Sequence, residues 1–85
     1  MQTHKSYAEL SECVVHLLHA ERIRRGLSKY AVEQRSGISQ QMVGFVERGL
    51  RRPSLETALR IAGGIGVDLG VLIQKAGKVA TKRKS

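Results

Sequence analysis

The side chains best suited to chemistry lie between residues 40 and 52, where two adjacent glutamines are followed by three arginines. Gln40 and Gln41 each carry an amide that both donates and accepts, the combination that bonds adenine bidentately through N6 and N7. Arg51 and Arg52 carry permanent positive charge, and such side chains commonly bind phosphate oxygens. Glutamines that can select a base, together with arginines that can bind the phosphate backbone, indicate recognition of a nucleic acid.

The charge balance of the chain favours the same kind of partner. Its 85 residues include 15 Lys and Arg against 7 Asp and Glu, which gives a formal net charge of +8 and a pI near 10.4. Part of this excess lies in the last residues of the chain, but most of it does not. So large an excess on one small domain indicates attraction to a polyanion, most often nucleic acid.

No constellation of residues indicates catalysis. The sequence has no phosphate-binding glycine loop, no paired carboxylates in a plausible pocket and no nucleophile beside a matched base. We therefore expect no enzymatic activity and no cofactor. His16 and His19 have i, i+3 spacing, but without a cysteine or carboxylate partner they indicate solvent exposure and no metal site.

Cysteine content and hydropathy bear on the compartment. Cys13 is the only cysteine, so no internal disulfide forms, and the residue reads as a small core side chain in a reducing compartment. No apolar run approaches the roughly 18 residues of a membrane span, and MQTHKSYAELSECVV is too polar for a signal peptide. We expect a cytoplasmic, nucleoid-associated protein with no membrane partner.

Apolar residues recur with helical period, and no stretch alternates convincingly with the period of a strand. Helices are expected over about residues 7–25, 29–36 and 40–48, with a fourth after Pro53 and a fifth after Asp68. Serines at three helix starts and glycines at three helix ends support these boundaries. These caps and stops are Ser28, Ser39 and Ser54, and Gly26, Gly37 and Gly49. We therefore predict an all-α fold of five short helices.

The expected apolar faces define a small core. In the first helix the face comprises Leu10, Cys13, Val14, Leu17 and Ala20. In the fourth it comprises Leu55, Ala58, Leu59, Ile61 and Ala62, after which GGIGVD is expected to break the helix. In the fifth it comprises Leu69, Leu72 and Ile73. One domain over residues 10–76 is expected between an N-terminal extension, residues 1–9, and a disordered basic tail, residues 77–85.

The link between the second and third helices is the most specific motif. A short helix, a glycine turn, a buried turn hydrophobe and a capped second helix make a helix-turn-helix over about residues 28–48. Together with its flanks, this segment resembles the lambda-repressor-like, Cro-type helix-turn-helix family over roughly residues 10–74. The matching residues are Arg22, Gly26-Leu27-Ser28, Gly37-Ile38-Ser39, Glu47-Arg48-Gly49, Pro53-Ser54-Leu55, Leu59, Ile61-Ala62 and Gly66-Val67-Asp68-Leu69.

The resemblance implies a compact five-helix fold whose third helix enters the major groove of double-stranded DNA. Family members are mostly transcriptional regulators of bacteria and phages, often bound as dimers to palindromic operators. It also implies that Arg22 and Glu47 form a largely buried structural pair, and that Gln40 and Gln41 face bases. Phosphates are expected to be bound by groups around the third helix: Lys29, Ser39, Met42 through its backbone, Arg48, Arg51 and Arg52.

The outer face of the third helix follows from its inner one. Val43 and Val46 are spaced to point inward, so the glutamines, Gly44 and Phe45 should lie outside. Phe45 could contact a thymine methyl, cover the gap left by Gly44, or join the core under a slightly different rotation.

Three positions depart from the family pattern. The family commonly has serine in place of Gly44, a polar or basic residue in place of Phe45, and alanine in place of Glu33. We expect Glu33 either to tilt outward or to pair with a cation such as Arg35 or Arg48.

A homodimer is expected to form through the fifth helix, with Val71 and Leu72 at its surface and Ile65 adjoining them. The function that fits best is a sequence-specific, dimeric regulator, such as a repressor or autoregulator, that reads a palindromic operator. Two alternatives remain at this point. One is an adaptor or antitoxin-type protein that uses the scaffold to bind a protein partner, and the other is a non-specific basic nucleic-acid-binding protein.

Overall fold

The computed structural model describes residues 6–84, with side chains described through residue 78. Five helices account for its regular structure, and the described residues form no strand, so the all-α prediction is confirmed. They are α1 (Tyr7–Arg24), α2 (Lys29–Ser36), α3 (Gln40–Glu47), α4 (Leu55–Ile65) and α5 (Leu69–Lys84).

Serine caps set the start of each of the three central helices. The hydroxyl oxygens of Ser28, Ser39 and Ser54 accept hydrogen bonds from the backbone N–H three residues ahead, at 3.0–3.1 Å. Each cap satisfies a donor that the first helical turn leaves free. At the other end of α2, Gly37 has φ 79°, a left-handed conformation that a residue with a β-carbon rarely adopts. The caps predicted from the sequence are confirmed.

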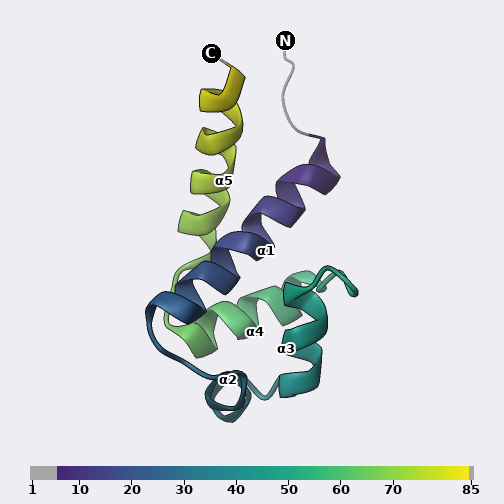
Figure 1. Cartoon of the computed structure of the whole chain (residues 1–85), viewed down its shortest axis with the longest axis vertical. Helices are drawn as coiled ribbons and strands as arrows, with labels where there is room; N and C mark the ends of the chain where they lie inside the picture. Colours follow the sequence, from purple (N-terminus) through teal and green to yellow (C-terminus); the bar gives the residue numbers. More distant parts are fainter. Residues whose placement is uncertain (1–5, 85) are drawn as a thin grey trace.

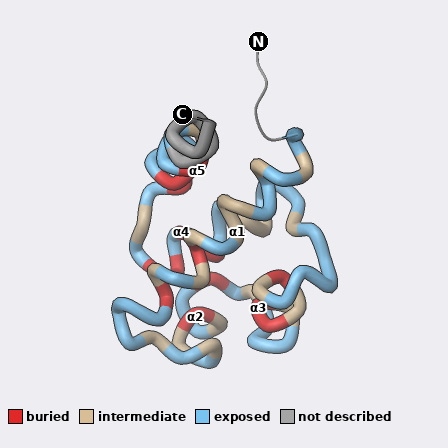
Figure 2. Tube along the Cα trace, turned by 45° about the horizontal axis from the view of Figure 1, so that its top comes forward, coloured by how far each residue is buried: buried red, intermediate tan, exposed pale blue. Residues whose placement is uncertain are grey.

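The helices pack so that α2 and α3 form one end of the molecule and α5 rises beside α1 at the other (Figure 1). Helix α2 packs on both α3 and α4, whereas α1 contacts α3, α4 and α5. Buried residues lie where the helices face one another (Figure 2). The apolar core comprises Leu18, Val32, Val43, Val46, Ile61, Ala62, Ile65, Leu69 and Leu72.

The buried face of α1 differs from the predicted stripe. Leu18 and Arg22 are its buried residues, whereas Ala20 is exposed and the other predicted positions are only half-buried. The reason is that Leu18 and Arg22, spaced i, i+4, lie on the ridge that faces the other helices. Apolar periodicity does not predict that Arg22 is buried, because burial of its charge depends on Glu47, a partner distant in sequence.

The predicted face of α4 is wrong at two positions. Leu55 is 70% exposed and Leu59 is 52% exposed, because α4 turns Ile61, Ala62 and Ile65 toward the core instead. In the same way Ile73 of α5 is 45% exposed, while Leu69 and Leu72 are buried. The exposed side chains of these helices leave apolar surface on the outside of the domain.

The glycine-rich stretch GGIGVD ends α4 as expected, but at its third glycine and not at its first. The helix continues through Gly63 and Gly64 and ends at Gly66, which has φ 94°. A β-carbon on Gly64 would lie 3.2 Å from the carbonyl oxygen of Val32 and 3.0 Å from Cβ of Ser36. Gly64 therefore allows α2 to approach α4 closely, and only Gly66 acts as a stop.

The start of α1 agrees with the helix expected over about residues 7–25, but the helices extend beyond the domain boundaries expected at residues 10 and 76. Helix α1 begins at Tyr7, because Ser6 and Glu9 form a reciprocal capping box, so residues 7–9 belong to the helix. Helix α5 continues to Lys84, so the prediction of a disordered tail is wrong for residues 77–84; their alanine, lysine and arginine are good helix formers. Residues 1–5 and Ser85 lie outside the described residues.

A charged cluster secures the end of α1. Arg24 and Arg25 both pair with Glu21, and hydrogen bonds from Arg24 lower the pKa of Glu21 from 4.5 to about 2. The same interaction raises the pKa of Arg24. Nη1 of Arg25 also donates to the carbonyl oxygen of Gly66 at 3.1 Å, which links α1 to the turn between α4 and α5.

Candidate nucleic-acid interface

The rotation of α3 is set by its buried side. Val43 and Val46 are 0% and 2% exposed, and both belong to the core. Gln40 and Gln41 are exposed in the first turn of the helix, as the predicted rotation requires. In this position both amides are free of protein partners among the described residues, so their full hydrogen-bonding capacity faces outward.

The turn before α3 is held by side chains of α2. Ser36 accepts a hydrogen bond from the backbone N–H of Ile38 at 3.0 Å. Oε1 of Glu33 accepts one from the backbone N–H of Gln40 at 3.2 Å, where a carboxylate also complements the positive end of the helix. Glu33 neither tilts into solvent nor pairs with a cation, which corrects our expectation for this residue. Instead it fixes the first residue of α3 against α2.

An ion pair holds the last turn of α3. Arg22 donates from Nε to Oε2 of Glu47 at 2.7 Å and from Nη2 to Oε1 at 2.9 Å, and each side chain is 9% exposed. Nη1 of Arg22 also donates to the carbonyl oxygen of Leu27 at 2.8 Å. Nε2 of His19 lies 3.6 Å from Oε1 of Glu47. Arg22 thereby joins α1, the turn before α2 and the end of α3.

A hollow opens on the outer face of α3. It has a volume of about 390 Å³ and is lined by Lys29, Gln40, Gln41, Gly44, Phe45 and Arg48. Gly44 lies on this outer face but is itself buried, because cationic side chains lie over it. A β-carbon on Gly44 would lie 3.4 Å from Nη1 of Arg48 and 3.7 Å from Nζ of Lys29.

Phe45 forms one wall of the hollow and does not join the core. Its ring is half-buried, with the guanidinium carbon of Arg48 at 5.6 Å from the ring centroid and that of Arg51 at 5.9 Å. Such distances allow cation–π attraction. The ends of the Lys29 and Arg48 side chains lie over Gly44, and the position of Phe45 outside the core excludes one of the alternatives left open by the sequence.

Two of the expected phosphate-binding groups, Lys29 and Arg48, line this hollow. Ser39, Arg48, Arg51 and Arg52 are exposed, and Lys29 is half-buried. Within the part of the chain that the structure describes, these four cationic side chains form no ion pair with a carboxylate. Their positive charge is therefore not neutralised by the protein.

Met42 is placed differently from the other expected phosphate contacts. Its backbone N–H donates to Oγ of Ser39 at 3.1 Å, and its side chain packs against the core. The N–H expected to meet a phosphate is thus already engaged in the helix cap. The hydroxyl of Ser39 keeps its own proton for donation, so Ser39 is the polar group of this turn that remains available.

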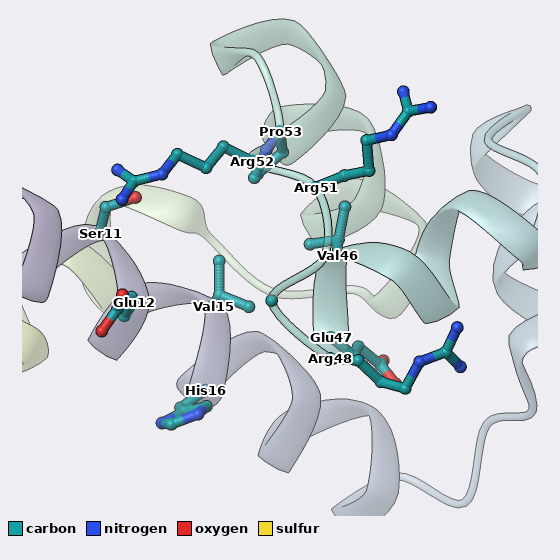
Figure 3. Close-up of a pocket in the computed structure, with 11 residues that line it drawn as sticks. Ser11, Glu12, Val15, His16, Val46, Glu47, Arg48, Arg51, Arg52 and Pro53 are labelled. Atoms are coloured by element: carbon teal, nitrogen blue, oxygen red, sulfur yellow. The ribbon is translucent and has the colours of Figure 1, made fainter.

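The arginines after α3 point to two sides of the loop. Figure 3 shows Arg52 extending toward Ser11 of α1, whereas Arg48 and Arg51 extend the other way. A second pocket of about 370 Å³ lies between α1 and this loop, and Ser11, His16, Arg52 and Pro53 are among its lining residues. Arg48 and Arg51 therefore lie on the side of Phe45, and Arg52 extends the cationic surface toward α1.

Two of the three residues expected at a dimer surface belong to the core. Ile65 is 2% exposed and Leu72 is 3% exposed, because the ends of α4 and α5 pack into the centre of the domain. Val71 is 50% exposed. An apolar surface that the sequence did not reveal is a groove between α1, α4 and α5, lined by Tyr7, Leu10, Val14, Leu55, Ala58 and Ile73 among others.

The described residues contain neither a cluster suited to a metal ion nor a helix suited to a membrane. No three or more histidine, cysteine, aspartate or glutamate side chains among them gather in a way that could hold a metal ion. No helix among them combines the length and the apolar character needed to cross a bilayer. Cys13 is half-buried.

Comparison with known proteins gives matches over the same part of the chain. The sequence model of the helix-turn-helix family matches residues 18–72. An uncharacterised HTH-type transcriptional regulator, y4dJ of Sinorhizobium fredii, is 46% identical over 49 residues, covering 55% of this chain and 64% of the relative. An uncharacterised HTH-type transcriptional regulator of Haemophilus influenzae is 29% identical over 65 residues, covering 76% of this chain and 66% of the relative.

The chain thus spans slightly less than two thirds of the length of these two relatives. No solved structure matches it significantly. The family match includes the end of α1, the whole of α2, α3 and α4, and the start of α5, which together contain Arg22, Glu47 and the hollow on α3. The resemblance seen in the sequence is therefore confirmed: the chain belongs to the lambda-repressor-like, Cro-type helix-turn-helix family.

Proposed function

We propose that this chain is a sequence-specific regulator of transcription that inserts α3 into the major groove of double-stranded DNA. The observation that carries the proposal is the exposed pair Gln40 and Gln41 in the first turn of α3, with unpaired cations around it. Recognition helices of this class contact base edges with their N-terminal residues. The two relatives described as HTH-type transcriptional regulators support the regulatory role.

Base choice and backbone binding are assigned to different groups. Gln40 and Gln41 select bases, and Phe45 contributes an apolar contact such as that with a thymine methyl. Lys29, Ser39, Arg51 and Arg52 bind phosphates on either side of the groove and so set the orientation of α3. The exposure of these groups and the absence of competing carboxylates among the described residues are what support this division.

The regulator is proposed to act as a homodimer, as a repressor or autoregulator on a palindromic operator. Apolar side chains that a monomer leaves in water, including Leu55 at 70% and Ile73 at 45% exposure, support association through the groove between α1, α4 and α5. Val71 supplies a further exposed apolar side chain on α5. A two-fold dimer would place its recognition helices about 34 Å apart, one turn of DNA.

Selection of bound DNA from a random duplex pool tests this function. The proposal predicts an enriched palindrome whose half-sites lie one helical turn apart. An enriched sequence without two-fold symmetry would support base readout but contradict the proposed binding as a homodimer. A pool that stays unenriched while binding DNA strongly at low salt would instead favour the non-specific basic protein. A pool that is not bound at all would favour the protein-binding adaptor.

A further inference from the structure

The side chain of Arg48 lies across the outer face of α3 rather than extending past its end. Arg48 is four residues after Gly44, so the two positions lie one above the other on the same face of the helix. A β-carbon on Gly44 would be only 3.4 Å from Nη1 of Arg48. Arg48 also lines the hollow that contains both exposed glutamines. Arg48 is therefore positioned in the same hollow as Gln40 and Gln41.

Two neighbours explain why Arg48 adopts this position. Gly44 has no side chain, so the guanidinium can lie close to the helix backbone. The ring of Phe45 lies 5.6 Å from the guanidinium carbon, a distance at which the ring attracts the cation. Arg51 contacts the same ring at 5.9 Å but does not line the hollow. Thus only one of the two arginines is held beside Gln40 and Gln41.

The donors of Arg48 remain unused by the protein. Among the described residues its guanidinium forms neither an ion pair nor a hydrogen bond. A planar guanidinium presents two parallel N–H donors, and in the major groove the O6 and N7 acceptors of guanine match that fork. With α3 in the major groove its outer face is turned toward the base edges, and the guanidinium of Arg48 lies over that face at Gly44.

We propose that Arg48 reads a guanine through O6 and N7, and that Phe45 is the positioning residue that holds its guanidinium over Gly44. The proposal rests on the function proposed above, because it requires α3 to occupy the major groove. It changes the role of Arg48, which the family resemblance placed among the phosphate contacts. The site thus reads guanine as well as the bases selected by the glutamines.

The decisive experiment uses the operator enriched from the random pool and the same operator with one guanine replaced by 7-deazaguanine. This analogue pairs normally but lacks the N7 acceptor. At one guanine in each half-site we expect the substitution to weaken binding of the unaltered protein several-fold, which is less than the roughly 5- to 150-fold cost of losing the whole bidentate contact because O6 still accepts. Arg48→Ala should bind both operators equally at that position.

Two variants serve as comparisons in the same assay. Arg51→Ala removes a cation from the same phenylalanine ring, yet it should retain the full effect of 7-deazaguanine. Phe45→Leu should reduce that effect, and Phe45→Tyr should restore it, while circular dichroism melting shows that all variants fold. A merely structural role for Phe45 would alter melting temperature without altering the response to the analogue.

The outcomes separate this inference from the function on which it rests. If the pool yields no enriched sequence, the proposed function itself fails. If an operator is enriched but holds no guanine that responds to 7-deazaguanine, or if Arg48→Ala responds as strongly as the unaltered protein, only the role of Arg48 is overturned. An equal decrease in affinity of Arg48→Ala for every sequence, with a reduced salt dependence, would identify Arg48 as a phosphate contact.

Discussion

Arg22 and Glu47 form a bidentate ion pair that spans 25 residues of sequence and leaves each side chain 9% exposed. The pair fixes where α3 ends relative to α1, and Arg22 extends the connection to the carbonyl oxygen of Leu27. Helix α3 is thus held at its last turn through Glu47 and at its first residue by Glu33. Glu33 binds a backbone N–H and Arg22 binds the side chain of Glu47, so neither constraint uses the outer side chains Gln40 and Gln41.

Removing one member of the pair should be strongly destabilising. Arg22→Ala leaves the carboxylate of Glu47 buried without its guanidinium, a change that typically costs about 3–5 kcal/mol. For an 85-residue chain this is a large part of the free energy of unfolding, so we expect a substantial unfolded fraction. Urea denaturation followed by circular dichroism measures the effect.

The exposed ion pair between Arg24 and Glu21, near the end of α1, provides the control. Arg24→Ala removes a partner of Glu21, but Arg24 is 64% exposed, so water replaces the missing interaction and the change should be small. If Arg22→Ala is no more destabilising than Arg24→Ala, the pair does not hold α3. Replacing both Arg22 and Glu47 by methionine should recover part of the stability, because no unpaired charge remains buried.

Replacing the glutamines should change base preference without abolishing DNA binding. In Gln40→Ala and Gln41→Ala we expect discrimination between bases to fall at particular operator positions. The decrease should be about 1–3 kcal/mol for each bidentate contact with a base that is lost. Binding to unrelated DNA should persist, since it depends on phosphate contacts. Competition assays with single-base operator variants give the measurement. An equal decrease in affinity for every sequence would show that the glutamines do not read bases.

The elements that local chemistry determines could be predicted from the sequence. Ser28, Ser39 and Gly37 specify where helices begin or end because their hydrogen bonds and backbone angles involve residues close in the chain. The outward position of Gln40 and Gln41 followed from the inward position of Val43 and Val46, which belong to the same short helix.

Features that depend on distant partners could not be predicted in this way. The burial of Arg22 with Glu47 was implied by the family resemblance and not by local chemistry, and Gly64 lies inside a helix because α2 passes against it. Ile65 and Leu72 looked available for a partner because the sequence does not reveal how far a small core extends. The direction of the Arg48 side chain depends on Phe45 and Gly44 together, and helical periodicity contains no information about it.

Removing the arginines that follow α3 should weaken binding to all DNA sequences alike. Arg51→Ala and Arg52→Ala each remove one proposed phosphate contact, so the slope of log K against log salt should fall by about 0.9 per contact. Titrations over a range of salt concentrations measure this slope. Lys75→Ala, an exposed cation on α5, is the matched control and should leave the slope unchanged. If the slope is unaltered in all three variants, Arg51 and Arg52 do not bind phosphates.

A charge in the apolar groove should dissociate the proposed dimer. Ile73→Glu would bury a carboxylate between two copies, and we expect the dissociation constant to rise by at least about tenfold. Val71→Glu should have a smaller effect, because Val71 does not line the groove. Analytical ultracentrifugation measures the constant. Ile23→Glu, at a 58% exposed position outside the groove, is the control and should associate like the unaltered protein.

Gly44→Ala should raise stability while impairing recognition. Alanine is favoured over glycine within a helix by up to about 1 kcal/mol, and the added methyl would meet mainly the flexible ends of Arg48 and Lys29. The displaced guanidinium should then leave its position in the hollow, so preference for the enriched operator over unrelated DNA should decrease. Thermal melting and competition binding measure the two effects. Gly63→Ala, a helical position with no atom near the added carbon, should raise stability and leave operator preference unchanged. If both variants keep full preference, the open space at Gly44 has no part in positioning Arg48.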